Sequence, residues 1–584
     1  MIQYDKIKSV KKEIFVVKKW WMESVGYQIY PKSFYDSNGD GIGDLPGIIE
    51  KLDYLSTLGI DLIWICPFYD SPMDDNGYDV RNFFDVSKEF GTMDDVKRLI
   101  KEAKKRNIKI ILDFVLNHTS DEHPWFIESR KSLDNPYRDY YIWQEGKLKD
   151  GKKVEPTNWG SFFGGSAWKY DELTDQYYMK IFSDKMPDLN WKNESVQLAM
   201  IDVANKWLDL GVDGFRIDAV SHLDRAPFED TTISNDRYPL DWFKFSNLPL
   251  VHTYLKKLNK EVFAKRDCLT IGEVGGSASI EEGIKYASFD SDELSMVFNF
   301  DHNWCNNGFE VDHVKHLKTN VKNLKHAFTS WQLAFKEIGW LPLYWLNHDQ
   351  PRVMSQYGNL KYPLESGKML ATLLHMLRGT PFIYQGEEIG MTNYPFEDVT
   401  DFNDISSKAS YYRELEKEPD NPPKALRKAS MTSRDNARTP MQWSSDFHAG
   451  FTTGKPWLKI NPNYKKINVE KNLNQKDSLF HYYQKLIDLR KHSKYKDVIV
   501  YGKFKPIETD DDLFVYERMN EDKRLLIICS FSLKKKIFKI DGKVKEIILS
   551  NIDKTIIKDD NIYLKPYQAI ILELEETYYN KSSN

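Results

Sequence analysis

The chain has 584 residues, of which 41% are hydrophobic and 14% aromatic, so it can build large cores and is not wholly disordered. Its formal net charge of −5 at pH 7 argues against nonspecific nucleic-acid binding, which needs a positive surface. The four cysteines stand far apart without a CxxC motif, which argues against a disulfide framework and a structural zinc site.

The N-terminal segment is basic throughout, and its longest apolar run covers only residues 14–17. A secretory signal needs about 7–15 apolar residues and a membrane span about 18 or more, so the sequence predicts neither. We therefore expect a soluble cytoplasmic protein without a membrane or nucleic-acid partner. Composition does not distinguish a monomer from a small homo-oligomer.

Short apolar segments alternate with helical patterns along most of the chain. Several segments, such as 108–115, are continuous apolar runs, as expected for strands buried on both faces of a parallel sheet. Apolar residues spaced by three or four predict helices over 45–58 and 93–106. Strand and helix alternate eight times, so the fold class predicted is α/β, a (β/α)8 TIM barrel. The predicted strands are 24–34, 58–66, 108–117, 212–220, 269–274, 294–300, 341–348 and 381–385.

Two further regions do not belong to a minimal barrel. A long stretch rich in Gly, Trp and Tyr follows the third strand, and a loop of that length indicates an inserted domain. After about residue 496, short alternating runs separated by turns predict an antiparallel β-domain. The domains expected are the barrel over 1–117 and 188–496, the inserted domain over 118–187, and a β-sandwich-like domain over 497–584.

Carboxylates and histidines cluster at the predicted strand ends, where a barrel of this kind places its active site. They stand in five motifs from remote parts of the sequence, so convergence is a better explanation than five unrelated surface charges. The motifs are NGYD at 76–79, DFVLNH at 113–118, GFRID at 214–218, GEV at 272–274 and NHDQPR at 347–352.

These motifs resemble the α-amylase superfamily of glycoside hydrolases, family 13, over nearly the whole chain. The segments MPDLNW at 186–191 and SRDNARTPMQW at 433–443 resemble its oligo-1,6-glucosidase and α-glucosidase subgroup. The resemblance implies that Asp218 is the nucleophile, Glu273 the general acid/base, and Asp349 a third carboxylate that binds sugar hydroxyls. Retaining glycoside cleavage needs one carboxylate to attack the anomeric carbon and a second to move the proton.

The same resemblance assigns residues around the first sugar. It implies hydrogen bonds from His118 and His348 to hydroxyls, and a glucose stacked on Tyr78. Asp79 and Arg434 would grip hydroxyls at the far end and close the pocket, which implies release of terminal glucose. Arg216 lies two residues before Asp218 on one strand face, so its charge should favour the ionised carboxylate.

The segment DSNGDGIGD at 36–44 carries regularly spaced oxygen side chains, which suit a hard cation. It lacks the Glu that an EF-hand has at its twelfth position, where Gly47 stands, so it is not that motif. It resembles the calcium loop of the glucosidase subgroup, which implies a structural Ca2+ bound by the Ile42 carbonyl and four side chains. Those side chains are Asp36, Asn38, Asp40 and Asp44.

The linkage preference stays open because two places depart from the subgroup. Ala219 follows the nucleophile where α-1,6-specific relatives typically have Val and α-1,4-specific relatives Thr. Residues 299–307, NFDHNWCNN, also differ from the usual sequence after the sixth strand. Both places would border the leaving group. We expect relaxed cleavage of α-1,6 and at least one other α-link in short oligosaccharides, without an organic cofactor.

Several relatives remain as alternatives. Trehalose synthase and sucrose isomerase use the same carboxylates but keep the cleaved sugar, and the Arg-rich loop typical of sucrose isomerases is not found after Phe300. Trehalose-6-phosphate hydrolase would need a phosphate-binding cluster, which the sequence does not reveal. A non-catalytic subunit of an amino-acid transporter would carry a membrane span and could lack the catalytic acids. This sequence shows no such span and keeps all three acids.

Overall fold

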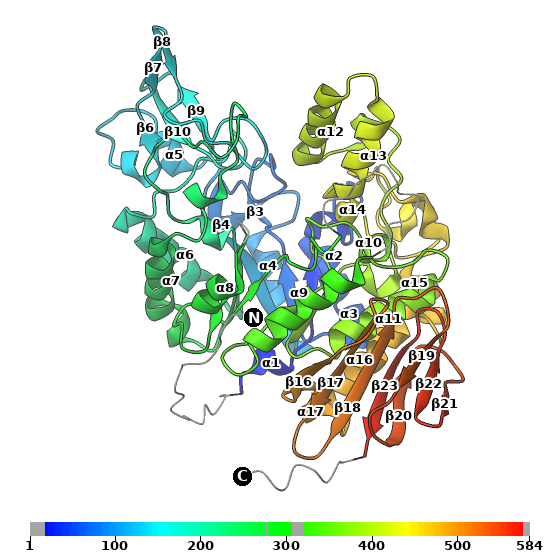
Figure 1. The fold of residues 1–584 in the computed structure, drawn as a ribbon. Helices are drawn as coiled ribbons and strands as arrows, with labels where there is room; N and C mark the ends of the chain where they lie inside the picture. Colours follow the sequence, from blue (N-terminus) through cyan, green and yellow to red (C-terminus); the bar gives the residue numbers. More distant parts are fainter. Residues whose placement is uncertain (1–17, 276–277, 307–318, 576–584) are drawn as a thin grey trace.

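A computed structural model describes residues 18–275, 278–306 and 319–575 (Figure 1). Its centre is an eight-stranded parallel sheet in the order β13-β12-β11-β5-β2-β1-β15-β14, which curls into a nearly closed barrel. Seven strands fall inside predicted segments and β15 begins one residue before its own, which confirms the (β/α)8 fold. The strands are β1 (Gly26–Ile29), β2 (Leu62–Ile65), β5 (Lys109–Val115), β11 (Gly214–Asp218), β12 (Leu269–Glu273), β13 (Met296–Phe298), β14 (Pro342–Leu343) and β15 (Thr380–Tyr384).

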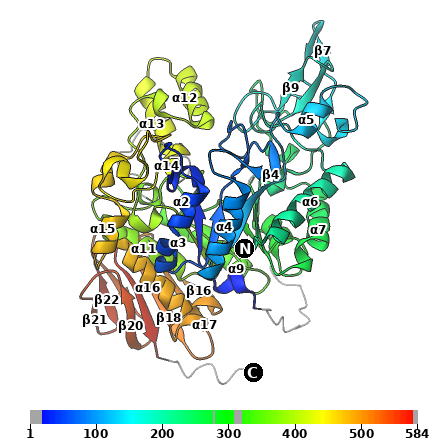
Figure 2. The ribbon, with the colours of Figure 1, turned by 180° about the vertical axis from the view of Figure 1, so that it is seen from behind.

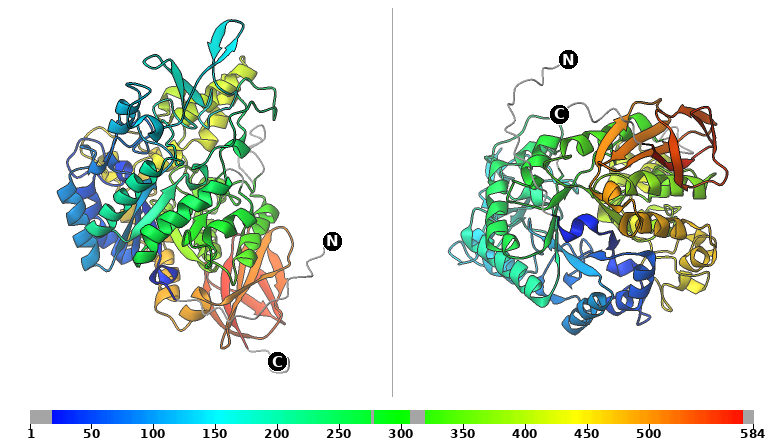
Figure 3. Two further views of the ribbon diagram at one scale, coloured as in Figure 1. Left: turned by 90° about the vertical axis from the view of Figure 1, so that its left-hand side faces the viewer. Right: turned by 90° about the horizontal axis from the view of Figure 1, so that it is seen from below.

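Helices surround this sheet, as the view from below shows (Figure 3). They bury their apolar stripes against strands that are themselves buried on both faces. The predicted helix over 45–58 is interrupted, because the backbone leaves the helical region at Lys51 (φ −100°, ψ 4°). The surrounding helices are α2 (Leu45–Glu50), α3 (Leu52–Leu58), α4 (Met93–Lys105), α6 (Glu194–Leu210), α7 (Pro249–Glu261), α8 (Ile280–Ala287), α9 (Val321–Ala334), α11 (Pro363–His375) and α16 (Leu479–Lys491).

Local signals in the sequence explain where these helices begin and end. Thr92 and Asp95 form a reciprocal capping box at the start of α4. Gly59 and Gly211 adopt left-handed conformations, with φ of 101° and 113°, and so terminate α3 and α6. Further short helices are α1 (Trp20–Glu23), α10 (Val353–Gln356), α14 (Asp435–Arg438), α15 (Val469–Asn474) and α17 (Lys496–Val500). Within the described ranges, no helix combines the length and hydropathy that a bilayer crossing requires.

Two projections rise above the carboxyl ends of the barrel strands (Figures 1 and 2). One is the inserted region after β5, with a three-stranded sheet, a hairpin and a short helix. The other, which the sequence analysis did not distinguish from the barrel, is the helical hairpin of α12 (Ile405–Lys417) and α13 (Pro422–Thr432). The inserted region contains α5 (Pro124–Ser129), β6 (Trp143–Gln144), β7 (Lys147–Lys149), β8 (Lys152–Val154), β9 (Trp168–Asp171) and β10 (Gln176–Met179). A small hairpin of β3 (Tyr69–Asp70) and β4 (Asn82–Val86) follows β2.

A buried arginine ties the inserted region to the barrel. Arg225 donates from Nη2 to Asn117 Oδ1 at 3.0 Å and to Asp188 Oδ2 at 2.8 Å. Asn117 and Asp188 flank the two ends of the insertion, and Arg225 follows β11. Because both partners are buried, this one guanidinium fixes where the insertion leaves and re-enters the barrel.

The C-terminal region consists of two antiparallel sheets, as predicted, with their own apolar core. The strand orders are β16-β17-β18-β23-β20 and β19-β22-β21. It begins with helix α17 rather than a strand. The boundaries given above for the three domains stay predictions. The strands are β16 (Lys503–Ile507), β17 (Leu513–Met519), β18 (Arg524–Ser530), β19 (Lys536–Lys539), β20 (Val544–Ser550), β21 (Ile556–Lys558), β22 (Asn561–Leu564) and β23 (Ala569–Leu574).

Candidate active site

Two acids end neighbouring barrel strands and share one buried arginine. Asp218 is the last residue of β11 and Glu273 the last residue of β12. Arg216 donates from Nη1 to Asp218 Oδ1 at 2.8 Å and from Nη2 to Glu273 Oε2 at 2.5 Å. It also contacts Asp113 Oδ1 at 2.5 Å, and its side chain is only 1% exposed. One guanidinium therefore holds the two predicted catalytic carboxylates at a fixed spacing.

Arg216 favours the ionised form of Asp218, as expected from the sequence, but burial acts in the opposite direction. Burial raises the pKa of Asp218 well above its ordinary value, and the nearby Glu273 and Asp113 add to this, while Arg216 opposes it. Burial likewise raises the pKa of Asp113 to about 6 against the charge of Arg216. Burial and the neighbouring acids therefore act against Arg216, whose positive charge favours the ionised Asp218 that a nucleophile requires.

The third predicted acid, Asp349, lies in the loop after β14 among cations. Arg438 Nη2 donates to its Oδ1 at 2.7 Å, and Arg434 Nη1 lies 3.5 Å from the same oxygen. Burial would raise the pKa of Asp349, but the charges of Arg434 and Arg438 hold it below its ordinary value. Asp349 is therefore ionised and can accept hydrogen bonds from hydroxyls.

Arg434 bridges three carboxylates. Its Nη2 donates to Asp75 Oδ1 at 2.9 Å and to Asp404 Oδ1 at 2.6 Å, and its Nη1 reaches Asp349. The ring of Phe163, from the inserted region, lies 5.1 Å from the guanidinium. We call Asp75, Asp349, Asp404, Arg434 and Arg438 the closed end of the site, because these side chains bond to one another and are mostly buried.

The predicted pairing of Arg434 with Asp79 is wrong, because Asp75 takes that place. Asp79 is fully buried, and its carboxylate accepts the backbone N–H groups of Asp74 and Asp75 at 2.8 and 3.0 Å. Burial raises its pKa to about 6. Asp79 therefore shapes the turn that presents Asp75 to the cavity and to Arg434.

Tyr78 contacts both predicted histidines, one through its ring and the other through its backbone carbonyl. The Tyr78 ring lies parallel to the His348 ring, with 5.2 Å between centroids and 6° between planes. His118 Nε2 lies 3.2 Å from the Tyr78 carbonyl. Burial lowers the pKa of His118 and of His348 to about 3, so both rings are neutral. Tyr78 and His118 line the cavity, whereas His348 and Arg216 support it from behind.

Ala219, next to Asp218, leaves the strand in a left-handed conformation with φ of 45° and ψ of 35°. This bend turns Ala219 into the cavity lining, as the sequence analysis required for a role beside the leaving group. Its N–H also donates to Glu273 Oε2 at 3.3 Å. A left-handed backbone is unfavourable for a β-branched residue, which suits Ala at this position.

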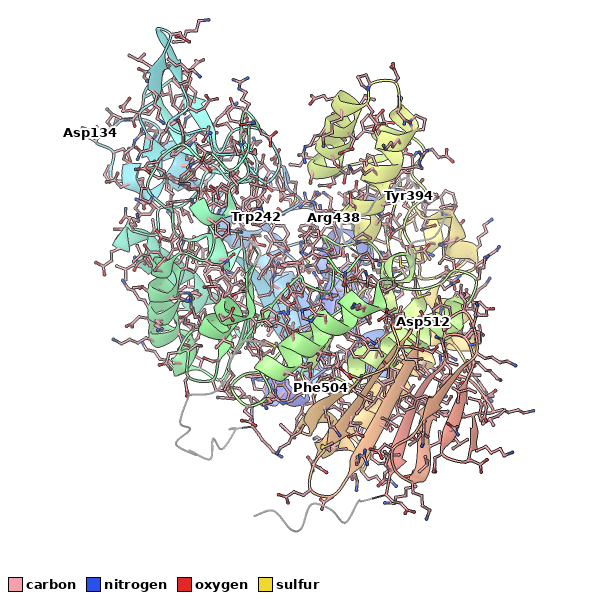
Figure 4. The ribbon with its side chains drawn as sticks, viewed as in Figure 1. Asp134, Trp242, Tyr394, Arg438, Phe504 and Asp512 are labelled. Carbon is pink, nitrogen blue, oxygen red and sulfur yellow. The ribbon has the colours of Figure 1, made fainter. Side chains whose placement is uncertain are left out.

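These groups enclose a cavity of about 490 Å3. Opposite the closed end, the turn after β13 contributes Asn299, Phe300, Asp301 and Trp304, which we call the open end because Asp301 and Trp304 are exposed. Figure 4 shows Trp242, another lining residue, below the inserted region, and Arg438 below the helical hairpin. Sequence reasoning missed Asp75, Asp404, Arg438 and Trp242. Only Arg438 carried a signal, since it lies in the 433–443 motif.

In the loop predicted to bind calcium, side-chain oxygens accept hydrogen bonds from backbone N–H groups of the same loop. Asp36 Oδ1 accepts from Asn38 N at 3.0 Å, Asn38 Oδ1 from Asp40 N at 2.9 Å, and Asp40 Oδ1 from Ile42 N at 2.9 Å. Asp44 caps α2 by accepting Gly47 N. Among the described residues, no three acidic, His or Cys side chains gather closely enough to hold a metal.

Comparison with known proteins agrees with this geometry. The family model "Alpha amylase, catalytic domain" matches residues 28–502. An oligo-1,6-glucosidase of Bacillus cereus is 47% identical over 570 residues, which cover 96% of this chain and 100% of the relative. A glucan 1,6-alpha-glucosidase of Streptococcus pneumoniae is 44% identical, covering 95% and 99%. The solved trehalose-6-phosphate hydrolase of Bacillus licheniformis has a TM-score of 0.88 at 41% identity, covering 96% and 100%.

Proposed function

The chain belongs to the α-amylase family of glycoside hydrolases, and we propose that it is a retaining, exo-acting α-glucosidase of the oligo-1,6-glucosidase type. The observation that carries this proposal is the meeting of Asp218, Glu273 and Asp349 in one cavity with a closed end. Because the side chains of the closed end bond to one another, a terminal sugar can bind there, whereas a longer chain cannot pass through the site.

In the first chemical step, the Asp218 carboxylate attacks the anomeric carbon while Glu273 gives its proton to the leaving oxygen. The glycosidic bond breaks, and a covalent glucosyl–Asp218 ester forms. Both acids contact the guanidinium of Arg216, and this shared contact supports the short carboxylate spacing of a retaining enzyme.

In the second step, Glu273 acts as a base. It takes a proton from water, the water oxygen attacks the anomeric carbon, and Asp218 leaves as a carboxylate. The two inversions return the α-configuration. Arg216 stabilises the negative charge on whichever acid is ionised, so the proton can move between steps without an uncompensated buried charge.

The closed end holds the glucose during both steps. Asp349 accepts sugar hydroxyls, while Arg434 and Arg438 keep it ionised. Asp75 and Arg434 face the hydroxyls farthest from the scissile bond, and the Tyr78 ring offers an apolar surface for stacking of the sugar. His118 lines the same part of the cavity and, being neutral, can donate one hydrogen bond and accept another.

The substrates are short oligosaccharides that end in α-linked glucose. Relatives named for α-1,6 links support that linkage, and the small Ala219 side chain supports cleavage of at least one other α-link. Trehalose 6-phosphate is a less suitable substrate, because the one Lys or Arg among the described lining residues is Arg434, which is paired with carboxylates.

We also propose a structural calcium ion at residues 36–44, where the side-chain oxygens that now accept backbone N–H groups suit a hard cation. The ion would stabilise the loop and take no part in chemistry. A ligand of the native state raises the melting temperature, so a chelator should lower it by a few degrees. Elemental analysis without calcium, together with an unchanged melting curve, would remove the ion from the proposal. Cytoplasmic location and oligomeric state stay predictions.

Hydrolysis of a substrate panel by the wild type and by Asp218→Asn tests the function. The panel contains isomaltose, panose, maltose, sucrose, trehalose and trehalose 6-phosphate. We expect glucose from isomaltose and panose, and a loss of about 10⁴-fold in turnover in the variant, because no other nucleophile is present. Preferred cleavage of trehalose 6-phosphate, conversion of sucrose to an isomer, or near-normal turnover by Asp218→Asn would contradict the proposal.

A further inference from the structure

Trp304 at the open end is a large aromatic side chain that is mostly exposed. It is 64% exposed although it lines the cavity, and none of the other described rings packs against it. Tryptophan side chains are usually largely buried, because their apolar area is large. An exposed tryptophan at the mouth of a binding cavity therefore offers a contact surface to a ligand.

The turn that carries Trp304 is firmly anchored. Asp301 Oδ2 accepts Trp331 Nε1 at 2.7 Å, and the buried His302 ring stacks on Phe328 with 5.2 Å between centroids. Tyr344 Oη donates to the Asn299 carbonyl at 2.5 Å. The Trp304 N–H donates to the Asp301 carbonyl at 3.3 Å. The ring is thus presented by a fixed backbone, so a ligand that stacks on it need not order the turn.

The barrel order places Trp304 next to the proton donor Glu273 and away from Asp75 of the closed end. β13, which precedes Trp304, is the neighbour of β12, which carries Glu273. β2, whose following loop carries Asp75, is separated from β13 by β12, β11 and β5. The proton donor must face the leaving oxygen. Trp304, which follows the strand beside Glu273, therefore lies next to the part of the cavity that takes the leaving group.

We propose that Trp304 is the platform on which the leaving-group part of the substrate stacks, and that this site selects neutral oligosaccharides. The C–H face of a sugar ring is apolar and matches an indole face, whereas the described residues of the open end contribute no cation for a phosphate. The inference rests on the proposed glucosidase function and adds the determinant of its leaving-group preference.

Trp304→Ala, Trp304→Phe and the control Phe447→Ala test this role with two substrates. Phe447 is 74% exposed and lies outside the cavity lining, so its removal matches the loss of an exposed ring. α-Glucosyl fluoride has no leaving-group sugar, while panose has two. The measured quantity is the ratio of kcat/KM for panose to kcat/KM for α-glucosyl fluoride, with KM and kcat recorded separately.

We expect Trp304→Ala to lower this ratio about tenfold, mainly through a higher KM for panose, because stacking contributes to ground and transition state alike. Trp304→Phe should recover most of the ratio, and Phe447→Ala should keep it. An unaltered ratio in Trp304→Ala, or an equal loss for both substrates, would overturn the inference while leaving the glucosidase function intact. If the wild type cleaves neither substrate, the proposed function itself fails, and the inference with it.

Discussion

The two ends of the cavity hold their side chains in opposite ways. At the closed end, Arg434 is bound by Asp75, Asp349 and Asp404, and Asp404 is 2% exposed. At the open end, Trp304 is 64% exposed and no described ring packs on it. The closed end is therefore complete before substrate arrives and fits one sugar, whereas the open end is completed by the substrate. Recognition of glucose and recognition of the leaving group should respond separately to mutation.

Arg434→Ala should give the largest effect of the substitutions that disturb one end. It leaves Asp75 and Asp404 as buried carboxylates without their cation, which typically costs about 3–5 kcal/mol of stability. We expect kcat/KM to fall at least about 100-fold, which is about 2.7 kcal/mol, and equally for panose and α-glucosyl fluoride. Thermal unfolding and kinetics on both substrates measure this. A loss confined to panose would show that the closed end also binds the leaving group.

A paired comparison of Asp75→Asn and Asp79→Asn tests which acid belongs to the closed end. Asp75 contacts Arg434, so its loss should reduce kcat/KM for α-glucosyl fluoride about tenfold or more, as for a charged hydrogen bond. Asp79 accepts backbone N–H groups inside a turn, so its substitution should lower the melting temperature more than it lowers activity of the folded protein. The reverse outcome would restore the pairing of Asp79 with Arg434.

Ala219 lies between the two ends, and its substitution should have a smaller effect. Because its φ is 45°, Ala219→Val introduces a β-branched residue into a left-handed backbone, at a cost of about 1–2 kcal/mol in unfolding free energy. Ala219→Gly is the matched control, since Gly adopts this conformation freely. We also expect Ala219→Val to shift the isomaltose-to-maltose preference toward isomaltose by less than about 100-fold, since small apolar changes discriminate by about 1–3 kcal/mol. Equal melting temperatures for the Val and Gly variants would contradict the strain.

The sequence predicted the barrel well because its strands are buried on both faces. Runs such as 108–115 have no polar face, so they identify strands without knowledge of their partners. The split at Lys51 and the α12–α13 hairpin were missed, since spacing alone does not show where a helix stops or which helices leave the barrel.

The sequence predicted the site residues that stand at strand ends, but missed Asp75 and Asp404, which lie in loops. Asp218 and Glu273 end strands, so their convergence follows from the barrel, and the structure brings both to Arg216. Asp75 lies in a turn where Asn76 and Gly77 have φ of 52° and 106°, and such a reversal decides which acid faces the cavity. Asp404 meets Arg434 from a remote loop, a contact that no local pattern encodes. The roles of these residues in catalysis stay predictions until they are measured.

The anomeric form of the first product tests the central claim most directly. Proton NMR during the first minutes of panose hydrolysis distinguishes α-glucose from β-glucose before mutarotation mixes them. Attack by Asp218 on one face of the anomeric carbon, followed by attack of water on the opposite face with Glu273 as base, predicts α-glucose released from the non-reducing end. β-Glucose as the first product, or release of a disaccharide from that end, would contradict the retaining, exo-acting mechanism built on these two acids and the closed end.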